Sequence, residues 1–175
     1  MNRSELEHVI RAASAITLQS HFVIIGSQAV LGEHPDAPKE LLASMEADLY
    51  PRDRPEDSVL IDGAIGEGSV FHATFGYYAH GVSTETASLP EGWEERLVPV
   101  QNAQTKDATG WCLETHDLGV SKLIAGREKD VAFVNVLVTH GLADPSLLGD
   151  RLSTAPVDPR IREVGRRTLE KIQRS

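Results

Sequence analysis

Two acidic residues near the middle of the chain, Glu46 and Asp48, stand two positions apart. On a strand this spacing points both carboxylates to one face of the sheet, where they suit a divalent cation. Upstream, an apolar run over residues 21–25 ends at Gly26 and Ser27, which predicts a buried strand that turns directly into a helix. Free N–H groups at a helix start, with a serine hydroxyl beside them, suit a phosphate. Together these residues could hold a magnesium–nucleoside triphosphate.

The elements that must position these residues follow from hydrophobic periodicity and turn residues. The predicted strands cover about residues 21–26, 41–50, 76–82 and 96–100. The predicted helices cover about residues 5–18, a short segment from 27, and residues 57–66, 117–126, 129–141, 145–152 and 159–173. Ser4 is the expected N-cap of the first helix, and Asp158 before Pro159 predicts the start of the last one. Strands come first and helices follow, so we expect an α+β fold.

Composition and charge exclude several classes of protein. The chain has 175 residues, of which 41% are hydrophobic and 25% charged, as in an ordinary globular domain. No stretch is long and apolar enough for a membrane span or a signal peptide, so we expect a cytoplasmic protein without a membrane partner. The net charge of -9 argues against a protein that coats nucleic acid. The basic segment 160–174 could still meet a local anionic partner, although a solvated helix face is the simpler interpretation.

Three motifs occur in the order found in a known superfamily. Gly26-Ser27, the pair Glu46-Ala47-Asp48, and the stretch Ser-Lys-Leu-Ile-Ala-Gly-Arg-Glu-Lys-Asp over residues 121–130 resemble the nucleotidyltransferase superfamily. More narrowly, the chain is similar to bacterial nucleotidyltransferase-like proteins related to abortive-infection toxins, over roughly residues 22–142. The resemblance implies a nucleotidyltransferase-like mixed sheet flanked by helices, with a helical C-terminal part. We therefore expect a core over residues 1–105, and a helical part over residues 106–175 packed on it as one compact unit.

The resemblance also implies roles for individual residues. Gly26 and Ser27 would hold the triphosphate, while Glu46 and Asp48 would coordinate Mg2+. The attacking group would be an acceptor hydroxyl on RNA, on a protein or on a small molecule, and pyrophosphate would leave.

Basic residues in the stretch 121–130 would complete the phosphate site. Lys122 would reach the phosphates, with Arg127 or Lys129 in support. Positions 122, 126 and 129 are expected to share one helix face.

The sequence departs from the superfamily pattern at three points. Its first acid is Glu46 rather than aspartate, and the segment between Ser27 and Glu46 is unusually long. Active members carry a further acid on a neighbouring strand, but the predicted strand over residues 76–82 has none and places His80 there instead. His80 could accept the hydroxyl proton or bind a metal, and Glu85 lies just beyond it.

Two functions are therefore open. One is a nucleotidyltransferase; the other is a catalytically weakened module of the same fold that binds a nucleotide or a protein, for example an antitoxin partner.

Each motif also has a purely structural interpretation. Gly26-Ser27 could be a tight turn with a serine cap, and the acidic pair could be the solvated face of an edge strand. The charges over residues 122–130 could form surface ion pairs on a helix. His80 could equally be a hydrogen-bonded strand histidine. The functional interpretation is favoured because all three motifs appear together and in order.

Overall fold

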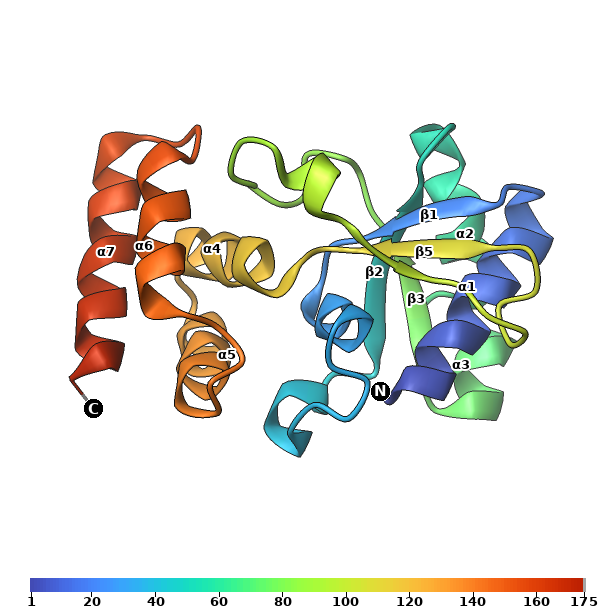
Figure 1. The fold of residues 1–175 in the computed structure, drawn as a ribbon. Helices are drawn as coiled ribbons and strands as arrows, with labels where there is room; N and C mark the ends of the chain where they lie inside the picture. Colours follow the sequence, from blue (N-terminus) through green and yellow to red (C-terminus); the bar gives the residue numbers. More distant parts are fainter. Residues whose placement is uncertain (175) are drawn as a thin grey trace. The chain divides into compact units, whose positions relative to one another are not determined.

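The computed structural model describes residues 1–174, which form two compact units (Figure 1). The sheet unit comprises Met1–Thr86 and Leu97–Leu113. The helical unit comprises Ala87–Arg96 and the chain from Glu114 onward. Within the described chain, no helix is long and apolar enough to cross a membrane.

The sheet unit is built on a mixed five-stranded sheet in the order β3-β2-β1-β5-β4. The strands are β1 (His21–Ile24), β2 (Glu46–Pro51), β3 (Tyr78–Gly81), β4 (Val98–Val100) and β5 (Thr109–Cys112). β1 pairs antiparallel with β2 and parallel with β5, β2 pairs parallel with β3, and β4 pairs antiparallel with β5. The expected mixed sheet containing the strands near Phe22, Ala47, Tyr78 and Val98 is confirmed.

Helices cover one face of this sheet. α1 (Arg3–Thr17) and α2 (Ser58–Ile65) lie side by side, and α3 (Val70–Phe75) follows α2. A Cβ at Gly110 of β5 would lie 2.5 Å from Ile10 of α1, and one at Gly81 of β3 would lie 1.9 Å from the Ser58 carbonyl oxygen of α2. These glycines therefore let both helices approach the same face closely. The N-cap of α1 is Asn2, in a capping box with Glu5, and not Ser4 as predicted.

The long connection between β1 and β2 contains short 3-10 helices instead of extended chain. η1 (Ser27–Gly32) starts directly after β1, and η2 (Lys39–Leu42) occupies the start of the strand predicted from residue 41. A third such helix, η3 (Pro55–Asp57), precedes α2. The unusual spacing noted between Ser27 and Glu46 is thus taken up by compact local structure.

Besides the 3-10 helices, one strand and one α-helix were missed from the sequence, and the strand bears on the expected boundary between the parts. β5 has only four residues, one of them a glycine, so it lacks the apolar run that announces a strand. The boundary expected at 105/106 would separate β5 from its partners β1 and β4, whereas the sheet unit extends to Leu113. The other missed element is α3, although Ser69 and Gly76 are recognisable caps for it.

The helical unit contains η4 (Trp93–Arg96), α4 (Thr115–Ala125), α5 (Glu128–Thr139), α6 (Pro145–Thr154) and α7 (Pro159–Gln173). Three of its α-helices begin at acidic N-caps, Glu114 for α4, Asp144 for α6 and Asp158 for α7, each of which accepts a backbone hydrogen bond. Apolar side chains that are almost fully buried form its core: Leu118, Val120, Leu123, Val134, Leu137, Leu148 and Leu152. The four predicted helices of this region are confirmed.

Candidate functional site

The register of the sheet brings the predicted acidic pair and His80 together. β2 and β3 run parallel, with Glu46 beside Tyr78 and Asp48 beside His80. Because residues opposite each other on paired strands point to the same face, all four side chains project from one face. Gly81, the next residue after His80, faces α2, so the acidic face is the one turned away from that helix. β3 is the edge strand of the sheet, and His80 therefore stands beside open solvent on one side.

The ring nitrogen Nδ1 of His80 lies between the two carboxylates. It is 3.2 Å from Asp48 Oδ1 and 3.4 Å from Glu46 Oε1. One ligand atom from each of the three residues lies within 4.8 Å of the others, and within residues 1–174 this is the single group of this kind. The His80 side chain is 50% exposed, Glu46 35% and Asp48 25%, so the cluster is open to a ligand from solution.

The predicted phosphate loop adjoins Asp48. The Ile25 amide donates to the Asp48 carbonyl oxygen at 3.1 Å. A Cβ added to Gly26 would lie 2.0 Å from Asp48 Oδ2, so only glycine leaves room for this carboxylate. Gly26-Ser27 and the acidic pair thus lie together and not on opposite sides of the sheet. The helix expected from Ser27 is present as the 3-10 helix η1, with Gly26 as its N-cap residue.

The three side chains of the cluster shift one another's pKa values. Burial, with a hydrogen bond to Glu46 and the charge of Glu46, raises the pKa of Asp48 to about 6. Burial also acts on Glu46, but its hydrogen bonds to Asp48 and Tyr78 and the charge of His80 lower its pKa below the usual value. For His80, burial opposes the charged form, whereas the charges of Asp48 and Glu46 outweigh it and raise the pKa. Two neighbouring carboxylates of this kind gain from a cation between them.

The donor set fits a divalent metal ion. Carboxylate oxygens are the ligands that Mg2+ and Mn2+ take from proteins, and an imidazole nitrogen is a better ligand for first-row transition ions than for Mg2+. Gly26 removes the side chain that would otherwise displace Asp48 Oδ2 from such a site. Glu46 and Asp48 are therefore placed where the sequence predicts the metal ligands to be.

The predicted phosphate-binding cations belong to the helical unit, where Lys122 and Arg127 have an acidic partner. Lys122 Nζ lies 3.2 Å from Asp130 Oδ1, and Arg127 Nε lies 2.6 Å from Asp130 Oδ2. Asp130 is 1% exposed, and these cations lower its pKa against the effect of burial. Lys129 is exposed.

The expectation that positions 122, 126 and 129 share a helix face is wrong. Gly126, with φ 64°, ends α4 in a left-handed conformation, and α5 begins only at Glu128.

Two residues next to the cluster were missed from the sequence. The Tyr78 hydroxyl donates to Glu46 Oε2 at 2.7 Å and holds that carboxylate. Its position two residues before His80 on one strand was the available signal, since both side chains must share a face. Gln28, which follows Ser27 in η1, is fully buried, and neither atom of its amide has a hydrogen-bond partner within the described residues. No periodicity or motif marks Gln28.

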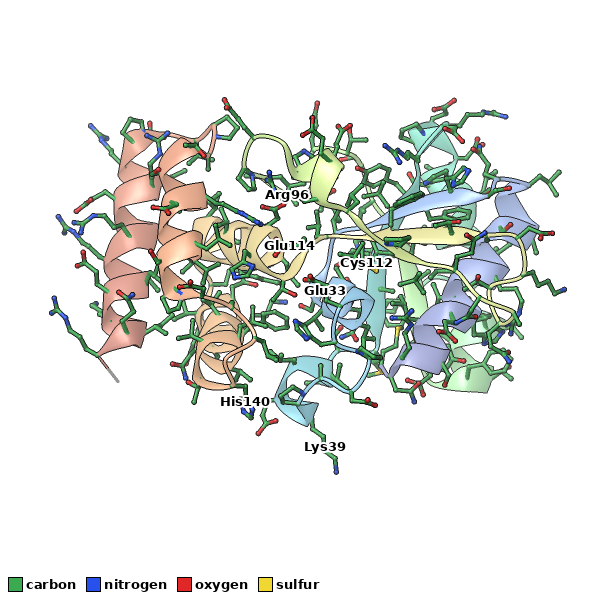
Figure 2. The ribbon with its side chains drawn as sticks, in the orientation of Figure 1. Glu33, Lys39, Arg96, Cys112, Glu114 and His140 are labelled. Atoms are coloured by element: carbon green, nitrogen blue, oxygen red, sulfur yellow. The ribbon has the colours of Figure 1, made fainter. Side chains whose placement is uncertain are left out.

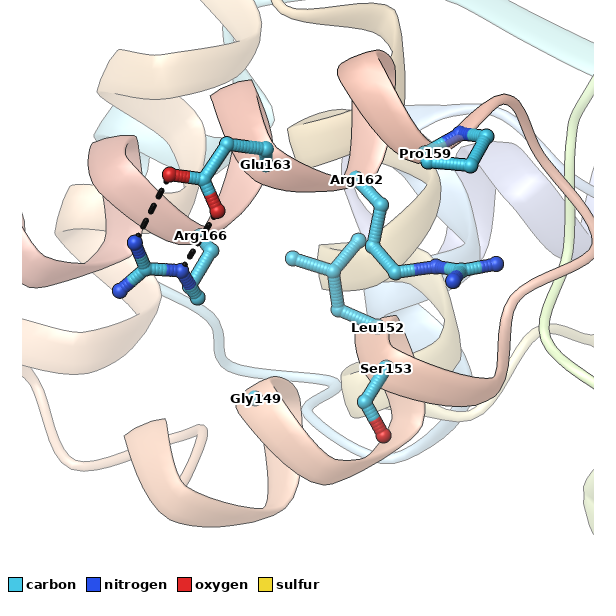
Figure 3. A pocket seen from close by; sticks show the side chains of 7 residues that line it. All are labelled: Gly149, Leu152, Ser153, Pro159, Arg162, Glu163 and Arg166. Carbon is cyan, nitrogen blue, oxygen red and sulfur yellow. Dashed lines mark hydrogen bonds and ion pairs between the residues drawn. The ribbon is translucent and has the colours of Figure 1, made fainter.

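Two other features offer no comparable chemistry. Cys112, labelled in Figure 2, is buried on β5, and burial raises the pKa of its thiol to about 12, so it is a core residue and not a nucleophile. A pocket of about 140 Å3 lies against α6 and α7 in the helical unit, near Leu152 and Arg162 (Figure 3). The Arg166 guanidinium at its side is already bonded to Glu163, as Figure 3 shows, and also to Glu170.

Comparison with known proteins identifies one family. The model of a family described as a nucleotidyltransferase of unknown function (DUF6036) matches residues 4–155, which include the whole acidic cluster and both predicted phosphate-binding segments. Comparisons with curated proteins and with solved structures gave no significant match.

Proposed function

The chain belongs to this nucleotidyltransferase family, and we propose that it transfers a nucleotide from a nucleoside triphosphate to an acceptor hydroxyl with the help of Mg2+. The observation that carries the proposal is the meeting of Asp48, Glu46 and Gly26 at one point of the sheet. The loop at Gly26 suits the phosphates of a metal–triphosphate complex, and the paired carboxylates beside it suit the metal ion.

Each residue has a role in this proposal. Glu46 and Asp48 hold the metal ion, and the Tyr78 hydroxyl keeps Glu46 oriented through its 2.7 Å hydrogen bond. Backbone N–H groups after Gly26 and the Ser27 hydroxyl donate to phosphate oxygens. When bound, the metal stabilises negative charge on the phosphates and lowers the pKa of the acceptor hydroxyl. The contribution of Lys122, Arg127 and Lys129 to phosphate binding stays a prediction, because Asp130 already engages the first two.

The transfer step is an in-line displacement at the α-phosphorus. The acceptor oxygen forms a bond to the α-phosphorus, and the bond from that phosphorus to the oxygen bridging to the β-phosphate breaks. Pyrophosphate leaves with the electron pair of the broken bond. The hydroxyl proton passes to water at the open side of the cluster, where the His80 side chain is half exposed. RNA, a protein and a small molecule are all acceptors of the required kind.

The experiment is a nucleotide-binding titration with and without Mg2+, on wild type and on Asp48→Ala. We expect wild type to bind the triphosphate only with Mg2+, and Asp48→Ala to weaken that binding by more than about 100-fold because a ligand is lost. Asp53→Ala is the matched control. It removes the same charge from an exposed residue beyond the other end of β2, and binding should be unchanged. Equal Mg2+-dependent binding by wild type and Asp48→Ala would contradict the proposal.

One observation favours a second candidate, a nucleotide-binding module without transfer activity. The strand next to β2 carries His80 where active members of the superfamily carry a further acid. Pyrophosphate release separates the two functions. A transferase releases pyrophosphate in proportion to the acceptor consumed. Tight Mg2+-dependent binding without release, with RNA, protein and small-molecule hydroxyls each supplied, would favour the binding module, whose partner on the family resemblance is an antitoxin-like protein.

A further inference from the structure

We infer that His80 is a third metal ligand, bound through Nδ1, and that it makes the cluster prefer Mn2+ to Mg2+. The inference rests on the proposed function only in placing the cation at Glu46 and Asp48. It concerns the metal chemistry of the protein alone, without nucleotide or acceptor.

The geometry of the three donors supports a shared ion. Ligand atoms bound side by side on one ion at about 2.1 Å lie about 3 Å apart in an octahedral site and about 3.4 Å apart in a tetrahedral one. The distances from His80 Nδ1 to Asp48 Oδ1 and to Glu46 Oε1 are 3.2 and 3.4 Å. The same nitrogen faces both carboxylates and forms a hydrogen bond with Asp48 Oδ1, and a cation would replace that hydrogen bond while the three ligand atoms stay within 4.8 Å of one another.

The sheet holds these donors in place. Asp48 and His80 are paired residues on adjacent parallel strands, so backbone hydrogen bonds set their separation. Glu46 is held from its other side by Tyr78, which bonds Oε2 and leaves Oε1 toward His80. Donors on regular strands keep their geometry better than donors on loops, which favours a metal site over an accidental surface contact.

The chemistry of the donors then selects the ion. Mg2+ prefers six oxygen ligands, and it keeps several of its waters. Imidazole is a better ligand for first-row transition ions, and affinity rises from Mn2+ along the series. Substituting a histidine for an acid therefore costs Mg2+ an oxygen ligand and a negative charge, but leaves Mn2+ with a good donor. The acids around His80, which are Asp48, Glu46 and Asp62, keep the surroundings negative enough for a dication.

This role has a consequence for the reaction. When Nδ1 binds the metal, its lone pair is not available to take the acceptor proton. His80 is then a metal ligand and not the general base that the sequence offered as one of its two roles.

The test uses Mn2+ and Mg2+ alone as probes, with equilibrium binding measured by titration and the ligands of bound Mn2+ by pulsed electron paramagnetic resonance. We expect wild type to bind Mn2+ at least about tenfold more tightly than Mg2+, and to show coupling of the Mn2+ electron spin to an imidazole nitrogen. His80→Ala should lose that coupling and about tenfold in Mn2+ affinity. His80→Asp should bring the affinity for Mg2+ up toward that for Mn2+.

His140→Ala is the control, because His140 is an exposed histidine of the helical unit (Figure 2). It should keep the nitrogen coupling. A coupling that survives in His80→Ala, or Mn2+ bound to wild type without any nitrogen coupling, would overturn the inference, as would a wild type that binds Mg2+ as tightly as Mn2+. A protein that shows the coupling but binds no triphosphate would support the inference while contradicting the proposed function.

Discussion

The acidic pair of the sheet unit and the buried acids of the helical unit have opposite surroundings. In the sheet unit, Asp48 and Glu46 face each other with only a half-exposed histidine between them. In the helical unit, Asp117 is fully buried, yet Arg96 bonds it through two nitrogens at 2.8 and 3.0 Å.

Two further acids of the helical unit, Glu114 and Asp130, are matched in the same way. Arg151 Nη1 bonds Asp117 Oδ1 at 2.9 Å and also contacts Glu114. Asp130, at 1% exposure, has Lys122 and Arg127. Permanent cations thus compensate every one of these carboxylates, as a purely structural role requires.

This difference separates carboxylates that stabilise the fold from carboxylates that are available to bind a metal ion. A buried carboxylate with guanidinium partners gains little from an added cation. Asp48 and Glu46 lack such partners within the described sheet unit, and burial, together with the hydrogen bond to Glu46 and its charge, raises the pKa of Asp48 to about 6. Carboxylates with perturbed pKa values in an open site are candidates for function, because a metal ion stabilises the charged form that burial and the neighbouring carboxylate oppose.

The largest expected effect on stability comes from making the same Asp→Asn substitution once in each unit. Asp117→Asn should lower the free energy of unfolding by about 4 kcal/mol, because two guanidiniums are left beside a neutral amide. Asp48→Asn, measured without metal, should leave stability equal or slightly higher, since it removes a repulsion. Chemical denaturation of both variants at neutral pH is the measurement. If the two substitutions cost the same, the division into structural and binding acids is wrong.

The contrast also shows how far the sequence could lead. The spacing of Glu46 and Asp48 predicted a shared face because strand geometry has a period of two, and this is confirmed. His80 was placed on the neighbouring strand by the resemblance to the superfamily, and the register of β2 and β3 pairs it with Asp48. Features of this kind can be predicted because they depend on only a few adjacent residues.

The rest depends on contacts between distant segments, which periodicity does not encode. β5 is a strand because β1 and β4 pair with it, although its own four residues carry little strand signal. The partner of Lys122 is a buried Asp130 on the next helix, and the sequence alone could not separate an ion pair from a phosphate-binding role there. That Gly26 is needed to accommodate Asp48 emerged only from the packing of η1 beside β2.

A second effect should appear when the helical unit is acidified. Burial acts to raise the pKa of Glu114, but hydrogen bonds from His116 and Arg151 lower it to about 2 from an ordinary value of 4.5. Because the folded-state pKa is depressed, this stabilisation is present above pH 4.5 and is lost as the pH falls toward 2. The shift corresponds to about 3 kcal/mol.

Comparison with Glu114→Gln isolates this contribution from the other acids. Wild type should be more stable than Glu114→Gln near pH 6, and the difference between them should shrink steadily from pH 4.5 to pH 2. Denaturation midpoints over this range give the curve. A difference that stays constant with pH would mean that the carboxylate of Glu114 is not held by its cationic partners.

A smaller change in stability is expected from a substitution in the sheet unit, at Gly26 beside Asp48. Gly26→Ala places a Cβ 2.0 Å from Asp48 Oδ2 and 2.8 and 2.9 Å from its Cγ and Cβ, so the whole Asp48 side chain must shift. The backbone at Gly26, with φ -79°, accepts alanine, and the cost therefore comes from this contact alone, about 1–2 kcal/mol. Affinity for Mn2+ or Mg2+ should fall about tenfold or more because a ligand is displaced.

Gly63→Ala is the matched control. It lies within α2 with nothing within 4 Å of the new Cβ, so it should leave metal binding unchanged and raise stability by about 0.5–1 kcal/mol. Metal affinity that is the same in both alanine variants would show that Asp48 binds no metal from its present position, and the absence of arginine or lysine partners at Glu46 and Asp48 would then need another explanation.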